Sequence, residues 1–86
     1  MTAPKITPFG RALGAEMRQR REDRGWTVSA LSRAWQVGID AIRAYERGAP
    51  LSVERFLQWC CLLRAAPAEV VHSLGIELSE LMTPTG

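Results

Sequence analysis

The sequence predicts an all-α protein built as a compact bundle of about five helices. Apolar residues recur at the three- and four-residue spacing of a helix face along most of the chain. Threonine, serine and glycine, which cap helices, stand at the ends of these segments. No segment alternates apolar and polar residues for long, so no strand is predicted.

The first two predicted helices begin at threonine caps. Thr7 precedes Pro8, which has no N–H to leave unpaired at a first helical position. We predict a helix over residues 9–24 that ends at Gly25. Thr27 caps the second helix. Its apolar face consists of Val28, Leu31 and Trp35.

The next two predicted helices are separated by a short turn. Residues 36–38, Gln-Val-Gly, break the second helix, and a third helix is predicted over residues 39–47 before Gly48. Ser52 caps a fourth helix. Its apolar face consists of Phe56, Trp59, Cys60 and Leu63.

Pro67 marks the start of the fifth predicted helix, and we expect Gly75 to end it. Residues 76–82 are expected to add a short amphipathic turn or two. The chain then divides into an N-terminal arm (residues 1–8), one helical domain (residues 9–75) and a C-terminal extension (residues 76–86) that either contributes to dimerisation or frays.

The composition indicates one small soluble domain. Of the 86 residues, 47% are hydrophobic and 23% are charged, which is ordinary for globular proteins. The longest apolar run, residues 59–63, is far below the ~18 residues of a membrane span. The first residues lead into no signal-peptide core. We therefore expect a cytoplasmic protein without a membrane segment.

Charge is unevenly distributed along the chain. Residues 1–64 carry eleven basic and six acidic side chains, a net charge of +5, whereas residues 65–86 carry three glutamates and no base. Ten of the eleven bases are arginines, whose guanidinium suits bidentate contacts with phosphates and bases. The pattern favours an anionic partner for the N-terminal three-quarters, although a solvated arginine-rich helix would give the same pattern.

Residues that could carry metal or catalytic chemistry are few. Cys60 and Cys61 are adjacent in sequence, and adjacent cysteines rarely bridge each other. His72 is the single histidine, so the chain offers no credible set of four zinc ligands. An apolar helix face disfavours a reactive thiolate. We expect no metal, no cofactor and no enzymatic activity.

Two short helices separated by a three-residue break, with another helix before them, match a helix-turn-helix arrangement. The residues that make the match specific are Leu13-Gly14-Ala15-Glu16-Met17-Arg18, Arg21, Gly25-Trp26-Thr27, Leu31, Val37, Ile42, Tyr45-Glu46-Arg47-Gly48, Ser52-Val53, Phe56-Leu57, Trp59-Cys60 and Leu63. Through these residues the chain resembles the XRE family of helix-turn-helix regulators, relatives of the lambdoid phage repressors and Cro proteins. The resemblance extends over residues 11–74.

The resemblance implies that residues 39–47 form the recognition helix, which is offered to the major groove of DNA. It also implies an ion pair between Arg21 on the first helix and Glu46 near the end of the recognition helix. Such a pair would hold the recognition helix on the rest of the bundle. Removal of one partner would cost on the order of 3 kcal/mol if the pair is well buried.

The sequence departs from the family pattern at two positions. The family often has a phosphate-binding glutamine at the start of the second helix, where this chain has Val28. The turn commonly holds a glycine, where this chain has Gln36, and a positive φ there would cost about 1 kcal/mol. Gly38 follows two residues later, so a differently shaped turn is the alternative.

Candidate DNA contacts lie on the second and third helices. The base-reading candidates are Ile39, Asp40, Arg43 and Ala44, and the phosphate-binding candidates are Thr27, Ser29, Arg33 and Arg47. An arginine can bind guanine, an aspartate can accept from cytosine, and a small apolar side chain can contact a thymine methyl. The alternatives are that Asp40 only favours the helix N-terminus and that the arginines, Arg18 included, are solvated surface charges. Trp26, Trp35, Tyr45 and Trp59 are expected in the core.

A second copy of the chain is expected as a partner. One recognition helix reads only a few base pairs, so specificity usually needs a second one about 34 Å away. Seven apolar residues remain once the core is assigned: Leu57, Cys61, Leu62, Val71, Leu78, Leu81 and Met82. We expect them to form a homodimer interface. The alternative is that residues 76–82 fold back and cover the excess.

The sequence therefore predicts a small sequence-specific regulator that binds double-stranded DNA. Its simplest form is a homodimeric repressor, phage Cro-like or of the actinobacterial type, that reads a pseudo-palindromic site. The alternative is a helix-turn-helix that binds a protein, as in an antitoxin or a phage adaptor. Its support is the apolar set Ile39, Ala41 and Ala44, together with the missing glutamine.

Overall fold

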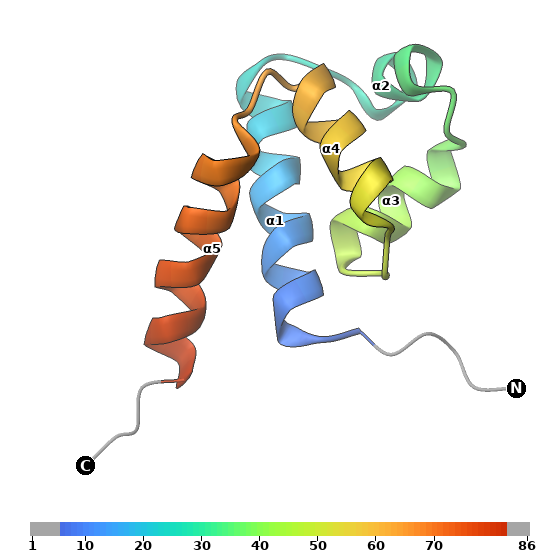
Figure 1. The fold of residues 1–86 in the computed structure, drawn as a ribbon. Helices are drawn as coiled ribbons and strands as arrows, with labels where there is room; N and C mark the ends of the chain where they lie inside the picture. The colour runs from blue at the N-terminus through green and yellow to red at the C-terminus, as the bar shows by residue number, and fades with distance from the viewer. Residues whose placement is uncertain (1–5, 83–86) are drawn as a thin grey trace, which may run out of the picture.

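The structure, a computed structural model, describes the backbone of residues 6–82 and the side chains of residues 6–75. Five α-helices follow one another in this range. They are α1 (Pro8–Asp23), α2 (Val28–Trp35), α3 (Ile39–Arg47), α4 (Val53–Leu62) and α5 (Pro67–Met82) (Figure 1). The predicted all-α class and helix number are confirmed.

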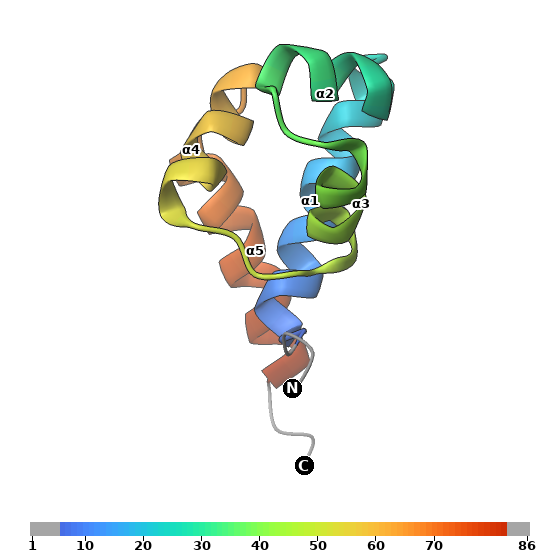
Figure 2. The ribbon, with the colours of Figure 1, turned by 90° about the vertical axis from the view of Figure 1, so that its right-hand side faces the viewer.

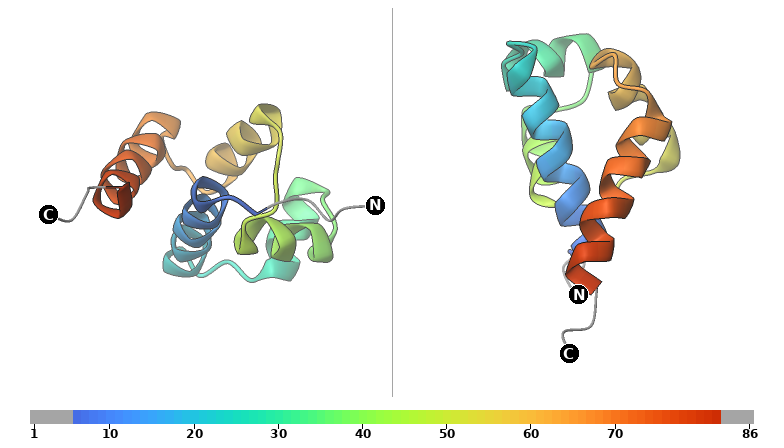
Figure 3. Two further views of the ribbon diagram at one scale, coloured as in Figure 1. Left: turned by 90° about the horizontal axis from the view of Figure 1, so that it is seen from below. Right: turned by 90° about the vertical axis from the view of Figure 1, so that its left-hand side faces the viewer.

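The helices are arranged around α1, which packs against α3 on one side and α5 on the other (Figures 1 and 3). The short α2 packs against both α3 and α4 and lies across one end of the molecule (Figure 2). Every helix contributes at least one fully buried side chain to the core between them, among them Met17, Leu31, Ile42, Trp59 and Leu74.

Three of the predicted caps fix helix starts in the structure. The hydroxyl oxygens of Thr7, Thr27 and Ser52 each accept a hydrogen bond from a backbone N–H three residues later, at 3.0, 3.0 and 3.1 Å. A cap of this kind is worth about 1 kcal/mol. α1 runs one residue earlier at both ends than the predicted residues 9–24.

Aromatic side chains link α2, α3 and α4. The rings of Trp35 and Trp59 stack with centroids 5.4 Å apart, and Tyr45 lies 6.0 and 6.2 Å from them. The indole N–H of Trp35 donates to Gln58 at 2.9 Å. Trp35 and Trp59 are buried as predicted, whereas Tyr45 and Trp26 are only partly buried against the core.

The predicted end of the fifth helix at Gly75 is wrong, because α5 continues to Met82. A glycine inside a helix costs only about 1 kcal/mol relative to alanine. The residues after it are rich in glutamate, leucine and methionine, which favour helix. The turn predicted for residues 76–82 is therefore the second half of α5. Whether its side chains fold back over the excess apolar surface lies outside the described residues.

Among the described residues, no helix has the length and apolar character needed to cross a membrane.

Candidate nucleic-acid interface

The turn between α2 and α3 keeps a left-handed residue although that residue is not glycine. Gln36 has φ 60° and ψ 37°, and its N–H donates to the Ser32 carbonyl at 2.8 Å. The Ser32 hydroxyl in turn donates to the Val37 carbonyl at 2.6 Å, and Val37 is buried in the core. Gly38 has an ordinary φ of −58°. The alternative turn based on Gly38 is therefore not adopted.

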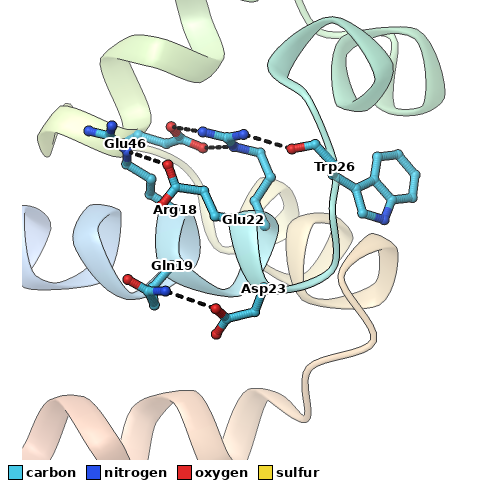
Figure 4. Close-up of polar contacts among 7 residues, drawn as sticks. Arg18, Gln19, Glu22, Asp23, Trp26 and Glu46 are labelled. Carbon is cyan, nitrogen blue, oxygen red and sulfur yellow. Dashed lines mark hydrogen bonds and ion pairs between the residues drawn. The ribbon is translucent and has the colours of Figure 1, made fainter.

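A buried ion pair joins α3 to α1. The Arg21 guanidinium donates to both Glu46 carboxylate oxygens, at 2.6 Å from Nε and 3.1 Å from Nη2. Its Nη1 donates to the Trp26 carbonyl at 2.7 Å (Figure 4). Only 9% and 7% of the two side chains are exposed. The hydrogen bond to Glu46 raises the pKa of Arg21, against the opposing effect of burial. This is the pair that the family resemblance implies.

The backbones of α1 and α3 meet beside this ion pair. A Cβ on Gly14 would lie 2.5 Å from the carbonyl oxygens of both Tyr45 and Glu46, so only glycine fits there. Gly48 ends α3 with φ 112°, a left-handed conformation that glycine adopts without strain. The position of α3 on the bundle is thus fixed by close backbone packing as well as by charge.

The outer side of α3 and the start of α2 face solvent. Of the base-reading candidates, Ile39, Asp40 and Arg43 are exposed and Ala44 is half-buried. The phosphate-binding candidates Thr27, Ser29, Arg33 and Arg47 are all exposed. The Thr27 oxygen accepts the cap hydrogen bond from Ala30, which leaves its O–H able to donate to a ligand.

A pocket of about 260 Å³ opens between α1, α2 and α3. It is lined by Arg18, Arg21, Val28, Arg43, Glu46 and Arg47. We call it the arginine pocket. The structure thus brings Arg43 and Arg47 together with Arg18. Arg18 is not among the DNA contacts predicted from the sequence.

Helical spacing could have predicted that Arg18 lies beside Arg43 in this pocket. Arg18 lies three residues before Arg21 on α1, and Arg43 lies three residues before Glu46 on α3. Residues three apart share a helix face. The implied ion pair therefore brings its two neighbours together as well.

The candidates for the dimer interface are partly uncovered. Leu57 and Val71 are 47% and 53% exposed, Cys61 is exposed, and Leu62 is half-buried. The side chains of Leu78, Leu81 and Met82 lie outside the described residues.

The described residues bring together no group of three histidine, cysteine, aspartate or glutamate side chains that could hold a metal ion. Cys60 is buried and Cys61 is exposed. Burial raises the pKa of the Cys60 thiol.

Residues 12–72 match the model of a protein family described as the helix-turn-helix domain. The chain belongs to this helix-turn-helix family. Within it, α2, the turn at Gln36 and α3 form the helix-turn-helix itself, and α1, α4 and α5 support it. The sequence-based assignment to helix-turn-helix regulators is confirmed. No curated protein matches this helix-turn-helix chain.

Two solved structures resemble this helix-turn-helix protein, both of the clp gene regulator ClgR from Corynebacterium glutamicum. The first is 32% identical with a TM-score of 0.75, and the match covers 86% of this chain and 95% of ClgR. The second is 28% identical with a TM-score of 0.74, covering 88% of this chain and 86% of ClgR. The similarity therefore extends over most of both chains.

Proposed function

We propose that this helix-turn-helix protein is a DNA-binding transcriptional regulator that inserts α3 into the major groove. The observation that carries the proposal is the contrast between the two sides of α3. Its inner side is fixed by the Arg21–Glu46 ion pair and the contact at Gly14, while Ile39, Asp40 and Arg43 face solvent. A recognition helix needs both a fixed position on the protein and a solvent-accessible face. Membership of the family and the likeness to a gene regulator support it.

The finer form of the proposal is a homodimeric repressor that reads a pseudo-palindromic site. Ile39, Asp40, Arg43 and Ala44 of α3 would contact base edges. Thr27, Ser29, Arg33 and Arg47 would bind phosphates, which position the protein without specifying sequence. Exposed Leu57 and Val71 support a second copy as the partner, because such side chains on the outer faces of α4 and α5 gain from burial.

The alternative, a helix-turn-helix that binds a protein through α3, has less support. It needs an apolar patch on that helix, and Ala41 and Ala44 are half-buried. Ile39 is 37% exposed and is the large apolar side chain that remains for such a contact in the described part of α3.

Sequence-specific DNA binding is tested by selecting duplexes from a random pool, once at low salt and once near 0.15 M salt. We expect a two-fold motif with half-sites about one DNA turn apart. Asp40→Ala should change the preference at one base pair of each half-site. Glu54→Ala is the matched control, because it also removes an acid from the first turn of a helix, α4. Binding without a motif that vanishes at the higher salt would overturn the proposal, and Ile39→Asp would then be tested for loss of a protein partner.

Sedimentation of the purified protein tests the dimer. Wild type should sediment as a dimer, and Val71→Glu or Leu57→Glu should shift it toward monomer at the same concentration. Ala34→Glu, which puts the same charge on an exposed apolar residue of α2 outside the proposed interface, should leave the dimer intact. A monomeric wild type at the concentration that gives DNA binding would refute the homodimer.

A further inference from the structure

The arginine pocket points to a DNA contact that α1 and α3 share. We propose that the guanidinium groups of Arg18, Arg43 and Arg47 bind one phosphate group of the DNA backbone in this pocket. The inference rests on the proposed function and adds α1 to the DNA-binding surface. It also assigns Arg43 to phosphate binding in place of base reading.

The charges that line the pocket favour an anion. Five of its six lining side chains are charged, four of them arginines and one a glutamate. Glu46 is already engaged by both of its oxygens with Arg21. The remaining three guanidinium groups therefore leave a surplus of positive charge that Glu46 does not neutralise. Arginine is well suited to bind phosphate oxygens through two parallel N–H donors.

The size and lining of the pocket argue against an apolar small molecule. Sites for drug-sized ligands are mostly apolar and commonly about 300–1,000 Å³. This pocket is smaller, about 260 Å³, and Val28 is its single apolar lining side chain. A compact anionic group such as phosphate suits these dimensions and this chemistry.

Arg18 can turn to a phosphate at little cost. Its Nε lies 3.3 Å from Glu22, but 61% and 46% of the two side chains are exposed, so water screens this pair. Figure 4 shows Arg18 and Glu22 on the side of α1 that faces Glu46, whereas Gln19 and Asp23 lie on the opposite side. A phosphate in the pocket can therefore compete with Glu22 for the guanidinium of Arg18.

The arginines of the pocket can replace the phosphate-binding glutamine that is missing at the start of α2. Val28 stands where the resembled family often has a phosphate-binding glutamine, and its side chain can make no hydrogen bond to an anion. The three arginines supply phosphate donors beside it, from α1 and from α3. A backbone phosphate and a free phosphate ion share this chemistry, so the test must separate these two sources.

The first test compares the salt dependence of binding to the selected duplex. Arg18→Ala should lower the slope of log K against log salt by about one. Between about 50 and 200 mM salt, wild type should then lose about fourfold more affinity than the variant. Arg24→Ala is the control, because it removes an equal charge and also breaks one exposed hydrogen bond, to the Arg64 carbonyl. Equal slopes for Arg18→Ala and Arg24→Ala would overturn the inference and leave the proposed function standing.

The second test neutralises single phosphates of the duplex as methylphosphonates. At one phosphate in each half-site, the substitution should weaken wild type and have little further effect on Arg18→Ala or Arg43→Ala. Arg43→Ala should also weaken all sequences alike, without altering the selected motif. Additive effects at every phosphate, or a motif relaxed by Arg43→Ala, would contradict the phosphate assignment.

A third test asks whether the arginine pocket binds a free phosphate ion instead of a DNA phosphate. The arginine Nε–Hε signals of the protein are followed by NMR in phosphate and in chloride of equal ionic strength. Saturable phosphate-specific shifts of Arg18, Arg43 and Arg47, without any coupled DNA phosphate, would identify a free anion as the occupant and overturn the DNA contact. If wild type selects no duplex at all, the proposed function fails and this inference fails with it.

Discussion

The two helices that flank α1 are held in different ways. On the α3 side, a bidentate ion pair and backbone contact at Gly14 fix the helix, and these contacts depend on direction and distance. On the α5 side, Val70 and Leu74 are buried in the core, while Val71 remains exposed. The helix proposed to read DNA must hold one orientation, which directional contacts specify. Apolar contact is non-directional, so it constrains the orientation of α5 less than the ion pair constrains α3.

The largest expected effect comes from the ion pair. Glu46→Ala leaves the Arg21 charge buried and unpaired and should lower the free energy of unfolding by about 3 kcal/mol. Glu22→Ala removes the exposed partner of Arg18 and should cost under about 0.5 kcal/mol. Urea denaturation of both variants measures the difference. Comparable losses from the two would show that the Arg21–Glu46 pair does not hold α3.

Glycines on the two sides should respond to alanine with opposite signs. Gly14→Ala pushes a Cβ against α3 backbone atoms at 2.5 Å and should destabilise by about 2 kcal/mol. Gly75→Ala, where no described atom lies within 4 Å of the added Cβ, should stabilise α5 by about 1 kcal/mol. Thermal unfolding by circular dichroism gives both values. A destabilising Gly75→Ala would mean that α5 packs tightly at that residue.

The turn that leads into α3 is constrained by the backbone conformation of Gln36. Gln36→Gly relieves a left-handed conformation and should stabilise by about 0.5–1 kcal/mol. Gln36→Val places a β-branched side chain at φ 60° and should destabilise by about 1 kcal/mol. Urea denaturation of these two variants measures both changes in the free energy of unfolding. A change in the same direction for both would place the φ of this residue outside the left-handed region.

The smallest expected effect concerns the adjacent cysteines on α4. Iodoacetamide should modify exposed Cys61 in the native protein and reach buried Cys60 only after unfolding, as mass spectrometry can show. Because burial raises the pKa of Cys60, the folded state keeps a proton that the unfolded state releases. Stability should therefore fall as pH rises above the ordinary thiol pKa of about 9. Cys60→Ala should abolish this part of the pH dependence, whereas Cys61→Ala should retain it.

Much of the fold could be predicted because its signals are local. The caps at Thr7, Thr27 and Ser52 bond to backbone groups three residues away, so the sequence alone places these helix starts. The end of the fifth helix could not be placed in this way. Gly75 carries the sequence signal of a helix end, but a penalty of about 1 kcal/mol is small enough for the rest of a helix to offset.

The candidate site was only partly predictable from the sequence, because some of its residues come together only through contacts between separate helices. Arg43 and Arg47 stand out because they lie on the exposed side of a recognised motif, whereas Arg18 is connected to them only through the implied Arg21–Glu46 pair, three residues further along each helix. Its place in the arginine pocket follows from the packing of α1 against α3, which joins residues 25 positions apart through the Arg21–Glu46 bond.

Periodicity and capping act over a few residues, so the helical class, the cap-defined helix starts and the helix-turn-helix can all be predicted from the sequence. The left-handed conformation of Gln36, the backbone contact at Gly14 and the arginine pocket become visible only in the packed fold. Each of these depends on how closely separate helices approach, and helices far apart in sequence come together only once the core between them is packed.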